Sequence, residues 1–517
     1  MVDDGFMNQR HLSFILVSLG TLTSLNAQEP APWNAELVTG LSGTYDGDAG
    51  FSTAETLGAA ITSDHVDLHM DLEMNNDRRY GSDTIYLSTG NDLGNYFLVN
   101  RGDVTVRGAG MTLQMGRFRP QDEIDSPYSL VLNPHALAQT GVKFSYTAGP
   151  FTYSSEWIQL NYQSNFGSVD STPPAWQYRW NGSGWVQDGT GFPDRGADIH
   201  NFVYRAGSWR FGIQDQSIYS GRSFDAEYFF SPMPQYFTEY LRTIGGRPWT
   251  SSSELDKYMV GFFADWTQDG QDAYFQFQLA DFNLHFLNPS LFPDNPAKFA
   301  WSLGGHTTND WGRWGFFHAG ATKYMYEAMT VSPGSESIRD VGNSYFPDTV
   351  YNRNGTFVPI DRQTNQIGYT KGENNLAFQA RWENNFSGNR LHLTSGLEFI
   401  IAGSNSPANP WQGTTEHPSN LGTRLLDETV LEKTIQADFG ADLALDSWTV
   451  SVHLTAGEAF NVMKLRNAPG YSLPPPTTQS VLTSLIPVWG PSNDNQGILT
   501  ATLGVKYSFD AASWLPR

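Results

Sequence analysis

The sequence predicts an all-β fold: a single transmembrane antiparallel β-barrel of about 18 strands, within a range of roughly 14–20, with long extracellular loops. Three observations predict it. Apolar and polar residues alternate over many short stretches, turn-forming residues separate these stretches, and charged residues are scarce. The 517 residues include 14% aromatic residues, 50 glycines and only 16% charged residues. This composition also excludes a disordered acidic chain, since enough apolar surface is present to be buried.

The clearest strand is the last one, at residues 498–509. Apolar side chains occupy one face and small or polar ones the other. The pattern of a single strand does not show whether the apolar face meets a protein core or lipid, but the same pattern recurs throughout the chain. Lipid demands apolar side chains outside a barrel, and a wet lumen accepts polar ones inside. We therefore expect lipid against the face formed by Leu499, Ala501, Leu503, Val505, Tyr507 and Phe509.

Hairpins set the expected number of strands. Residues 435–445 alternate in the same way, and an Asp–Ser turn leads into a second alternating stretch that starts at Trp448. Ala148-Gly149-Pro150 and Asp269-Gly270 are turns of the same kind. About 490 residues remain after a predicted signal peptide, and at about 55 residues per hairpin they give roughly 18 strands. Further strands are expected at 66–74, 142–146, 151–162, 202–213, 224–230, 258–266, 273–282, 298–304, 313–325, 375–383 and 390–401.

The N-terminus has the features of a secretory signal peptide. A short apolar stretch, Leu12–Leu25, follows Arg10, and Leu25-Asn26-Ala27 is a small-residue cleavage site. We predict a signal peptide at residues 1–27 and one barrel domain at residues 28–517. The acidic residues before Met7 favour Met7 over Met1 as the start. No other run approaches the ~20 apolar residues of a spanning helix, so the predicted location is the bacterial outer membrane.

Charge and motifs limit the partners. The formal charge is −22 and no Lys/Arg run occurs, which argues against nucleic acid. The chain has no cysteine and no HExxH, GxSxG or phosphate-binding glycine motif. We therefore predict no enzyme activity, no metal and no cofactor. The expected partners are outer-membrane lipid, possible surface polysaccharide, and the barrel-assembly machinery, which reads a closing strand that ends in an aromatic residue. Here eight residues follow Phe509.

Two groups of residues are candidates for ligand binding. A long polar loop, residues 164–196, carries Trp176, Trp180 and Trp185. Such aromatic residues can pack to keep a loop folded or offer flat faces to a sugar ring. The second group is charged and lies around residues expected in strands, where a charge on the lipid face would cost roughly 2–4 kcal/mol. We therefore expect lumen or rim positions, with a stiffening or a ligand-binding role, for Arg222, Asp225, Asp281 and Glu327.

Several of these segments resemble the Wzi-like capsule-assembly family. The resemblance is carried by GRSFDAEYFFSPMPQYFTEYL, YFQFQLADF and KYMYE, and earlier by MGRFRP and NPHALAQTGVKFSYTAGPFTYS, within residues 95–400. It implies a barrel of about 18 strands with a closed lumen and a surface role in holding capsular polysaccharide. It adds Arg117 and Arg119 to the candidates. The chain departs from the family at residues 363–372 and in its C-terminal tail.

These observations leave three functional hypotheses. The first is an outer-membrane barrel with a polysaccharide-binding or capsule-assembly-like role. The second is a diffusion porin or a channel for small or hydrophobic solutes, which polar luminal residues would serve. The third is an outer-membrane hydrolase, which would depend on a histidine such as His306 or His318.

Overall fold

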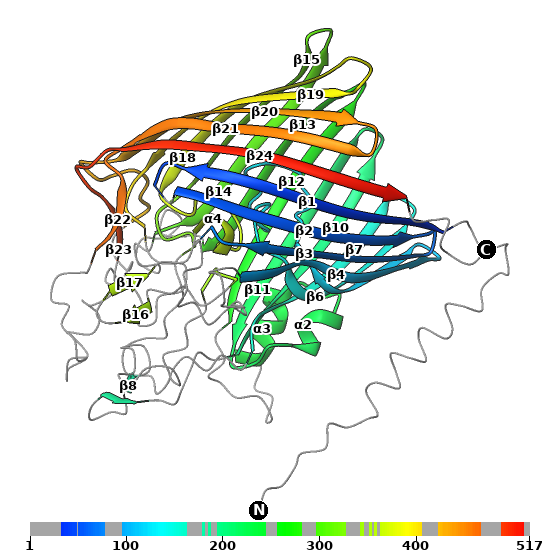
Figure 1. The fold of residues 1–517 in the computed structure, drawn as a ribbon. Helices are drawn as coiled ribbons and strands as arrows, with labels where there is room; N and C mark the ends of the chain where they lie inside the picture. The colour runs from blue at the N-terminus through cyan, green and yellow to red at the C-terminus, as the bar shows by residue number, and fades with distance from the viewer. Residues whose placement is uncertain are drawn as a thin grey trace, which may run out of the picture.

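The computed structural model is a closed antiparallel β-barrel of 18 strands (Figure 1). It describes residues 33–48, 50–77, 96–162, 178–180, 185–187, 194–243, 256–281, 296–326, 342–345, 351–353, 356–358, 362–405, 422–466 and 488–510. The predicted signal peptide, Trp176 and Glu327 lie outside these residues. The fold class and the strand number predicted from the alternating pattern are confirmed.

The barrel strands follow one another as neighbours around the wall. They are β1 (Asn34–Asp46), β2 (Gly50–Thr62), β3 (Val66–Asn75), β4 (Tyr96–Gly108), β5 (Met111–Phe118), β6 (Gln139–Ala148), β7 (Phe151–Asn161), β10 (Arg195–Ala206), β11 (Trp209–Ser220), β12 (Lys257–Gln268), β13 (Gln271–Asp281), β14 (Lys298–Asn309), β15 (Gly312–Ala321), β18 (Asn375–Phe386), β19 (Leu391–Ala402), β20 (Glu432–Leu445), β21 (Trp448–Phe460) and β24 (Gln496–Asp510).

Pairing of the first strand with the last closes the sheet. Leu37 of β1 stands opposite Phe509 of β24, and the register continues to Asp46 opposite Thr500. The predicted closing strand is therefore part of β24. Because every barrel strand has a partner on each side, no strand edge is left to face lipid.

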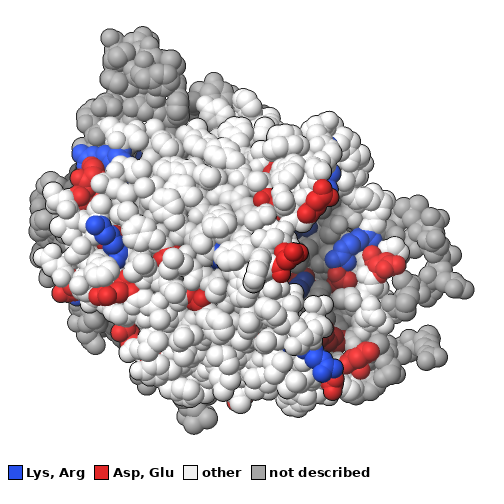
Figure 2. Space-filling model, turned by 90° about the horizontal axis from the view of Figure 1, so that it is seen from above, with Lys and Arg blue, Asp and Glu red and all other residues white. Residues whose placement is uncertain are grey.

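The outer face of the barrel is apolar. Leu503 on β24 is 57% exposed and Leu41 on β1 is 57% exposed, while their chain neighbours turn inward. Figure 2 shows a broad face broken by few charged side chains. Exposed apolar residues in this arrangement identify the lipid-facing surface of an outer-membrane β-barrel.

None of the helices in the described part of the chain is long and apolar enough to cross a membrane.

The two ends of the barrel differ in their connections. Eight turns of two to four residues join strands at the end where β1 begins and β24 finishes. At the other end, every connection except the β1–β2 turn has 16 or more residues. In bacterial barrels the short turns face the periplasm and the long loops face outward. We accordingly name these the periplasmic end and the extracellular end.

The connection between β11 and β12 corrects one prediction. Residues 224–230 do not form a strand: α2 (Ala226–Phe230) begins after Asp225, and α3 (Gln235–Thr243) follows it. The Asp225 side chain accepts hydrogen bonds from the backbone N–H groups of Glu227 and Tyr228, at 3.0 and 3.2 Å. This is an N-cap. Figure 1 places both helices beside the barrel wall.

Candidate functional site

Part of the lumen is filled by a segment that folds inward. The first plug segment (residues 119–138) connects β5 to β6, and Tyr128 and Leu130 in it are fully buried. The Tyr128 hydroxyl donates to Glu398 Oε1 at 2.7 Å, and the Leu130 N–H donates to Gln276 Oε1 at 3.0 Å. These contacts join the segment to β19 and β13. The inward fold therefore bridges two wall strands that are not neighbours in the sheet.

Asp122 holds the first plug segment together. Its Oδ2 accepts hydrogen bonds from the backbone of Val131 at 2.9 Å and of Leu132 at 3.3 Å. Its Oδ1 accepts from the Gln214 amide of β11 at 2.8 Å, and both oxygens accept from the Gln276 amide. One carboxylate thus fixes the turn of the segment and ties it to the barrel wall.

A second inward segment packs on the first. The second plug segment (residues 322–326, 342–345 and 362–374) belongs to the connection between β15 and β18. The Tyr326 hydroxyl donates to Gln278 Oε1 at 3.1 Å, and Asn133 Nδ2 donates to the Gln366 carbonyl at 3.0 Å. The two plug segments share one apolar core with the inner faces of β7, β10, β11, β12, β14, β15 and β18. This side of the lumen is therefore packed like a protein interior.

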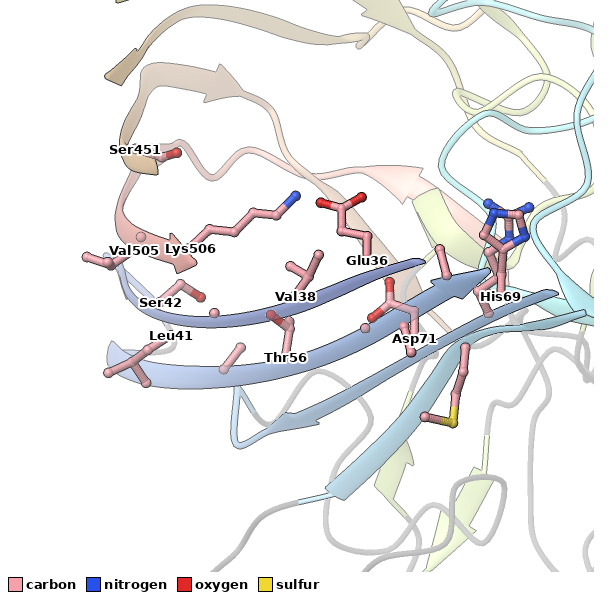
Figure 3. Close-up of a pocket in the computed structure, with 18 residues that line it drawn as sticks. Glu36, Val38, Leu41, Ser42, Thr56, His69, Asp71, Ser451, Val505 and Lys506 are labelled. Atoms are coloured by element: carbon pink, nitrogen blue, oxygen red, sulfur yellow. The ribbon is translucent and has the colours of Figure 1, made fainter. Parts of the chain in front are cut away.

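The opposite wall borders an open pocket of about 390 Å³. It is formed by the inner faces of β1–β4, β21 and β24 (Figure 3). Lys506 and Glu36 extend into this space, whereas Leu41 and Val505 point away from it. Hydroxyl and charged groups dominate the polar lining, which includes Glu36, Ser42, Thr56, His69, Asp71, Arg101, Ser451 and Lys506.

Three charged side chains of the pocket have no partner within the part of the chain that the structure describes. Among the described residues, Glu36, Asp71 and Lys506 make no side-chain hydrogen bond or ion pair, although Asp71 lies within electrostatic range of Lys506, Arg119 and Arg101. Unpaired charges of both signs are available to a polar or charged solute.

Positive charges also lie near His135 in the first plug segment. Burial, and then the positive charges of Lys371, Arg381 and Arg119, lower the pKa of His135 because each disfavours the protonated imidazole. Lys371 is paired with Glu398 at 3.0 Å. Arg119 and Arg381 form no ion pair within the described residues. The lumen therefore presents arginine side chains that are available to an anionic group.

The remaining predicted site residues are dispersed. Arg222 binds Asp225 at 2.5 Å and Asp256 at 2.7 Å, beyond the extracellular end of β11. This cluster caps α2 and anchors the helix pair, so the expectation that these charges lie in a strand is wrong, and they lie at the rim rather than in the lumen. Arg117 continues the outward-facing residues of β5, and its Nε donates to the Val99 carbonyl at 2.9 Å.

Other candidates are only partly described. Trp180 and Trp185 pair in register between two short strands, β8 (Tyr178–Trp180) and β9 (Trp185–Gln187). Asp281 ends β13 opposite Lys298. The side chains of these three residues lie outside the described part of the structure. Their ligand-binding role stays a prediction.

The two histidines considered for a hydrolase differ in position. His306 Nδ1 contacts Asp272 Oδ1 at 2.8 Å on the luminal side, and Arg313 joins Asp272 to Glu383. His318 accepts a hydrogen bond from Trp301 Nε1 at 3.1 Å, contacts the Ala377 carbonyl at 3.0 Å and stacks on exposed Phe378. The described residues contain no group of three or more His, Cys, Asp or Glu that could hold a metal.

Sequence reasoning did not find the luminal pocket. Its charged residues come from strands at both ends of the chain, and only their alternation marked them as inward-facing. The plug was equally hidden, because a buried loop has no periodic pattern. The one available signal was the apolar run Leu130–Leu132 between predicted strands.

Solved structures similar to this chain are bacterial outer-membrane barrels. Wzi of Escherichia coli, described as an outer-membrane protein involved in group 1 capsule assembly and as a carbohydrate-binding β-barrel, has a TM-score of 0.46 and 12% identity over 97% of this chain and 88% of Wzi. OprD of Pseudomonas aeruginosa has a TM-score of 0.43 and 10% identity over 95% and 96% of the two chains. OccAB2 of Acinetobacter baumannii has a TM-score of 0.41 and 10% identity over 93% and 98%. No protein-family model and no curated protein matches the chain.

Proposed function

We propose that this outer-membrane barrel binds a surface polysaccharide bearing charged groups, and that the luminal pocket receives part of it. The observation that carries the proposal is the division of the lumen. Two hydrogen-bonded plug segments fill one side, and a pocket of about 390 Å³ with hydroxyl groups and unpaired charges remains on the other. That volume lies within the range of small-molecule sites, about 300–1,000 Å³.

The chemistry of the pocket suits a saccharide. Ser42, Thr56 and Ser451 offer hydroxyl groups, which donate and accept hydrogen bonds as sugar hydroxyls do. Lys506 and Arg101 offer cationic donors to a carboxylate substituent. The sequence motifs that resemble the Wzi-like family support the same role. The tryptophans of the 164–196 loop remain candidates for a further contact at the extracellular end.

Binding to polysaccharide tests the proposal directly. Refolded barrel is passed over immobilised exopolysaccharide from its own host, and the affinity is measured by calorimetry. Lys506→Gln removes a charged donor worth about 1.5–3 kcal/mol, so the affinity should fall by about tenfold or more. Lys464→Gln is the matched control, because that exposed lysine pairs with Asp494 outside the pocket. Absence of retention, or an equal loss of affinity in both variants, would contradict the proposal.

A solute channel is the second candidate. The observation that favours it is the row of unpaired charges on the inner wall, from Glu36 to Lys506, which could also line a solute path. The two candidates differ in planar-bilayer recordings of the refolded barrel. A steady open conductance together with no polysaccharide binding would establish the channel in place of the binding role.

A further inference from the structure

One sector of the outer wall carries polar residues where lipid is expected. On β20 the outward face is apolar from Ile435 through Leu445. On β11 the outward face begins with Trp209, Phe211 and Ile213, which are all exposed, and then changes. The next outward positions on β11 and its neighbour β10 are Asp215, Ser217, His200 and Asp198, and all four are buried.

The depth of these residues places them within the hydrocarbon. A strand tilted by about 40° advances about 2.5 Å along the membrane normal per residue, and the apolar band of such barrels is about 25 Å tall. Trp209 lies at the periplasmic end of the wall, and Asp215 is six residues further along the same strand. Asp215 therefore stands about 15 Å above the lower edge of the band. An uncovered carboxylate at that depth would face acyl chains.

The helix pair α2–α3 covers this sector from outside the barrel. The Gln235 N–H, at the start of α3, donates to Asp215 Oδ2 at 2.9 Å. The Ser155 hydroxyl of β7 donates to the Phe229 carbonyl at 2.7 Å, and Trp157 Nε1 donates to the Ser223 carbonyl at 2.7 Å. The polar groups of the wall thus satisfy backbone groups at the helix ends. In lipid, such backbone groups need a partner within the protein.

The far side of the helix pair is aromatic. Phe230 is 72% exposed, Phe237 52%, Tyr236 51% and Phe224 41%. These rings continue the aromatic surface of the wall, because Phe224 contacts Trp157 of β7 at 5.3 Å and Tyr236 contacts Tyr258 of β12 at 5.7 Å between ring centroids. Further along β12, Phe262 faces outward and is 45% exposed. The exposed apolar surface of the barrel, which is interrupted at β11, therefore continues over the outer side of the two helices.

We propose that the outward aromatic patch of α2–α3, formed by Phe224, Phe230, Tyr236 and Phe237, contacts lipid acyl chains in the outer leaflet. The helix pair replaces the missing apolar surface of β10 and β11 and shields Asp198, His200 and Asp215 from lipid. Lipid is the occupant because the patch is continuous with the lipid-facing wall on both sides. A role of this kind is independent of what the lumen binds.

The chain offers a direct test because it contains no cysteine. Phe237→Cys is labelled with a nitroxide, and the barrel is reconstituted in phospholipid vesicles. Accessibility of the label to oxygen, which concentrates in hydrocarbon, is compared with its accessibility to a water-soluble nickel chelate. Leu503→Cys on the lipid-facing side of β24 and Ser451→Cys in the luminal pocket are the controls. Phe230→Cys provides a second position if Phe237→Cys does not fold.

The proposal expects the helix labels to match Leu503→Cys, with high oxygen and low nickel accessibility. A nickel-accessible label resembling Ser451→Cys would overturn it, because the patch would then face water. Low accessibility to both reagents together with dipolar broadening between labels would also overturn it, since a second copy of the chain would occupy the patch.

Discussion

Glu428 shows how one carboxylate can join two extracellular connections. It lies between β19 and β20, and its Oε1 accepts from Lys323 at 3.2 Å and from Asn374 at 3.0 Å, both in the connection that contains the second plug segment. Burial alone would raise the pKa of Glu428, but the hydrogen bond from Ser404, the charge of Lys323 and the Asn374 amide together lower it below its ordinary value. The ionised form is therefore the one that stabilises the fold.

The direction of that pKa shift predicts an acid-sensitive contact. A lowered pKa contributes stability above the unfolded-state value of 4.5, and the contribution is lost as the pH falls through the lower folded-state pKa. Glu428→Gln should lower the free energy of unfolding by about 1–3 kcal/mol at neutral pH. The difference from the unmodified protein should shrink at about pH 3. Urea titrations of the refolded barrel at the two pH values measure both.

Asp427→Asn is the matched control for this measurement. Asp427 is more exposed than its neighbour and pairs with Arg424 at 3.4 Å three residues earlier. An exposed pair of this kind contributes little, so its removal should leave both titrations nearly unchanged. A Glu428→Gln variant equally destabilised at both pH values would contradict the pKa argument.

Single residues also show where sequence-based reasoning stops. The sequence marks Asp225 and Arg222 as unusual charges, but their spacing does not reveal that Asp225 caps a helix. Lys506 and Asp71 are ordinary polar positions of alternating strands, and they line one pocket only because closure of the barrel pairs β24 with β1, two strands from β3. Pairs so distant in sequence leave no local pattern.

Among the elements, the first plug segment determines what the lumen can do. Asp122→Ala removes the acceptor shared by the Val131 and Leu132 N–H groups and by two wall glutamines. The two backbone N–H groups would be left unpaired, at about 1–3 kcal/mol each, whereas the glutamine amides keep their hydrogen bonds to Asn201 and Gln214. We expect the segment to loosen, and single-channel recordings should show a larger or noisier conductance than the unmodified barrel.

Asp125→Ala serves as the control in the same segment. Asp125 is exposed and makes no side-chain hydrogen bond within the described residues, so its removal should leave the recordings unchanged. If Asp122→Ala and the unmodified protein gave identical traces in folded barrels, the plug would not be the element that limits passage.

Elements with regular alternation were predictable, and elements without it were not. The hairpin of β20 and β21 follows directly from a period of two, since one face must meet lipid. Residues 224–230 also contain closely spaced aromatic residues, yet they form a helix because Asp225 caps it and Pro232 soon follows. A short aromatic run fits a strand and a helix equally well, so here the cap and the proline decide between them.

For the whole molecule, the asymmetry of the two ends predicts the orientation in the membrane. Asp48 lies in the β1–β2 turn at the extracellular end, and Ser208 lies in the β10–β11 turn at the periplasmic end. On intact cells, a membrane-impermeant maleimide should label Asp48→Cys and leave Ser208→Cys unlabelled. Permeabilised cells should label both. Selective labelling of Ser208→Cys on intact cells would reverse the assignment.

The whole fold was more predictable than the site, for a physical reason. The membrane imposes one rule on every strand, so each strand repeats the same evidence for a barrel. The luminal site obeys no such rule, because water accepts any polar side chain and the plug is specified by individual contacts such as that of Tyr128 with Glu398. The alternation repeated in every strand therefore predicts the fold, whereas the luminal site depends on single contacts that leave no repeated pattern in the sequence.

The pairing of β1 with β24 has a consequence for how the barrel assembles. Leu37 and Phe509 stand opposite each other although nearly the whole chain separates them. Every other pair of neighbours along the wall is joined by a single connection, whereas this seam needs both ends of the barrel sequence. Contacts between such distant segments form slowly, and until then β1 exposes an open edge that invites pairing with another chain. We therefore expect closure of the seam to come late in folding, and the open edge of β1 to be the place where an unclosed barrel is most open to aggregation.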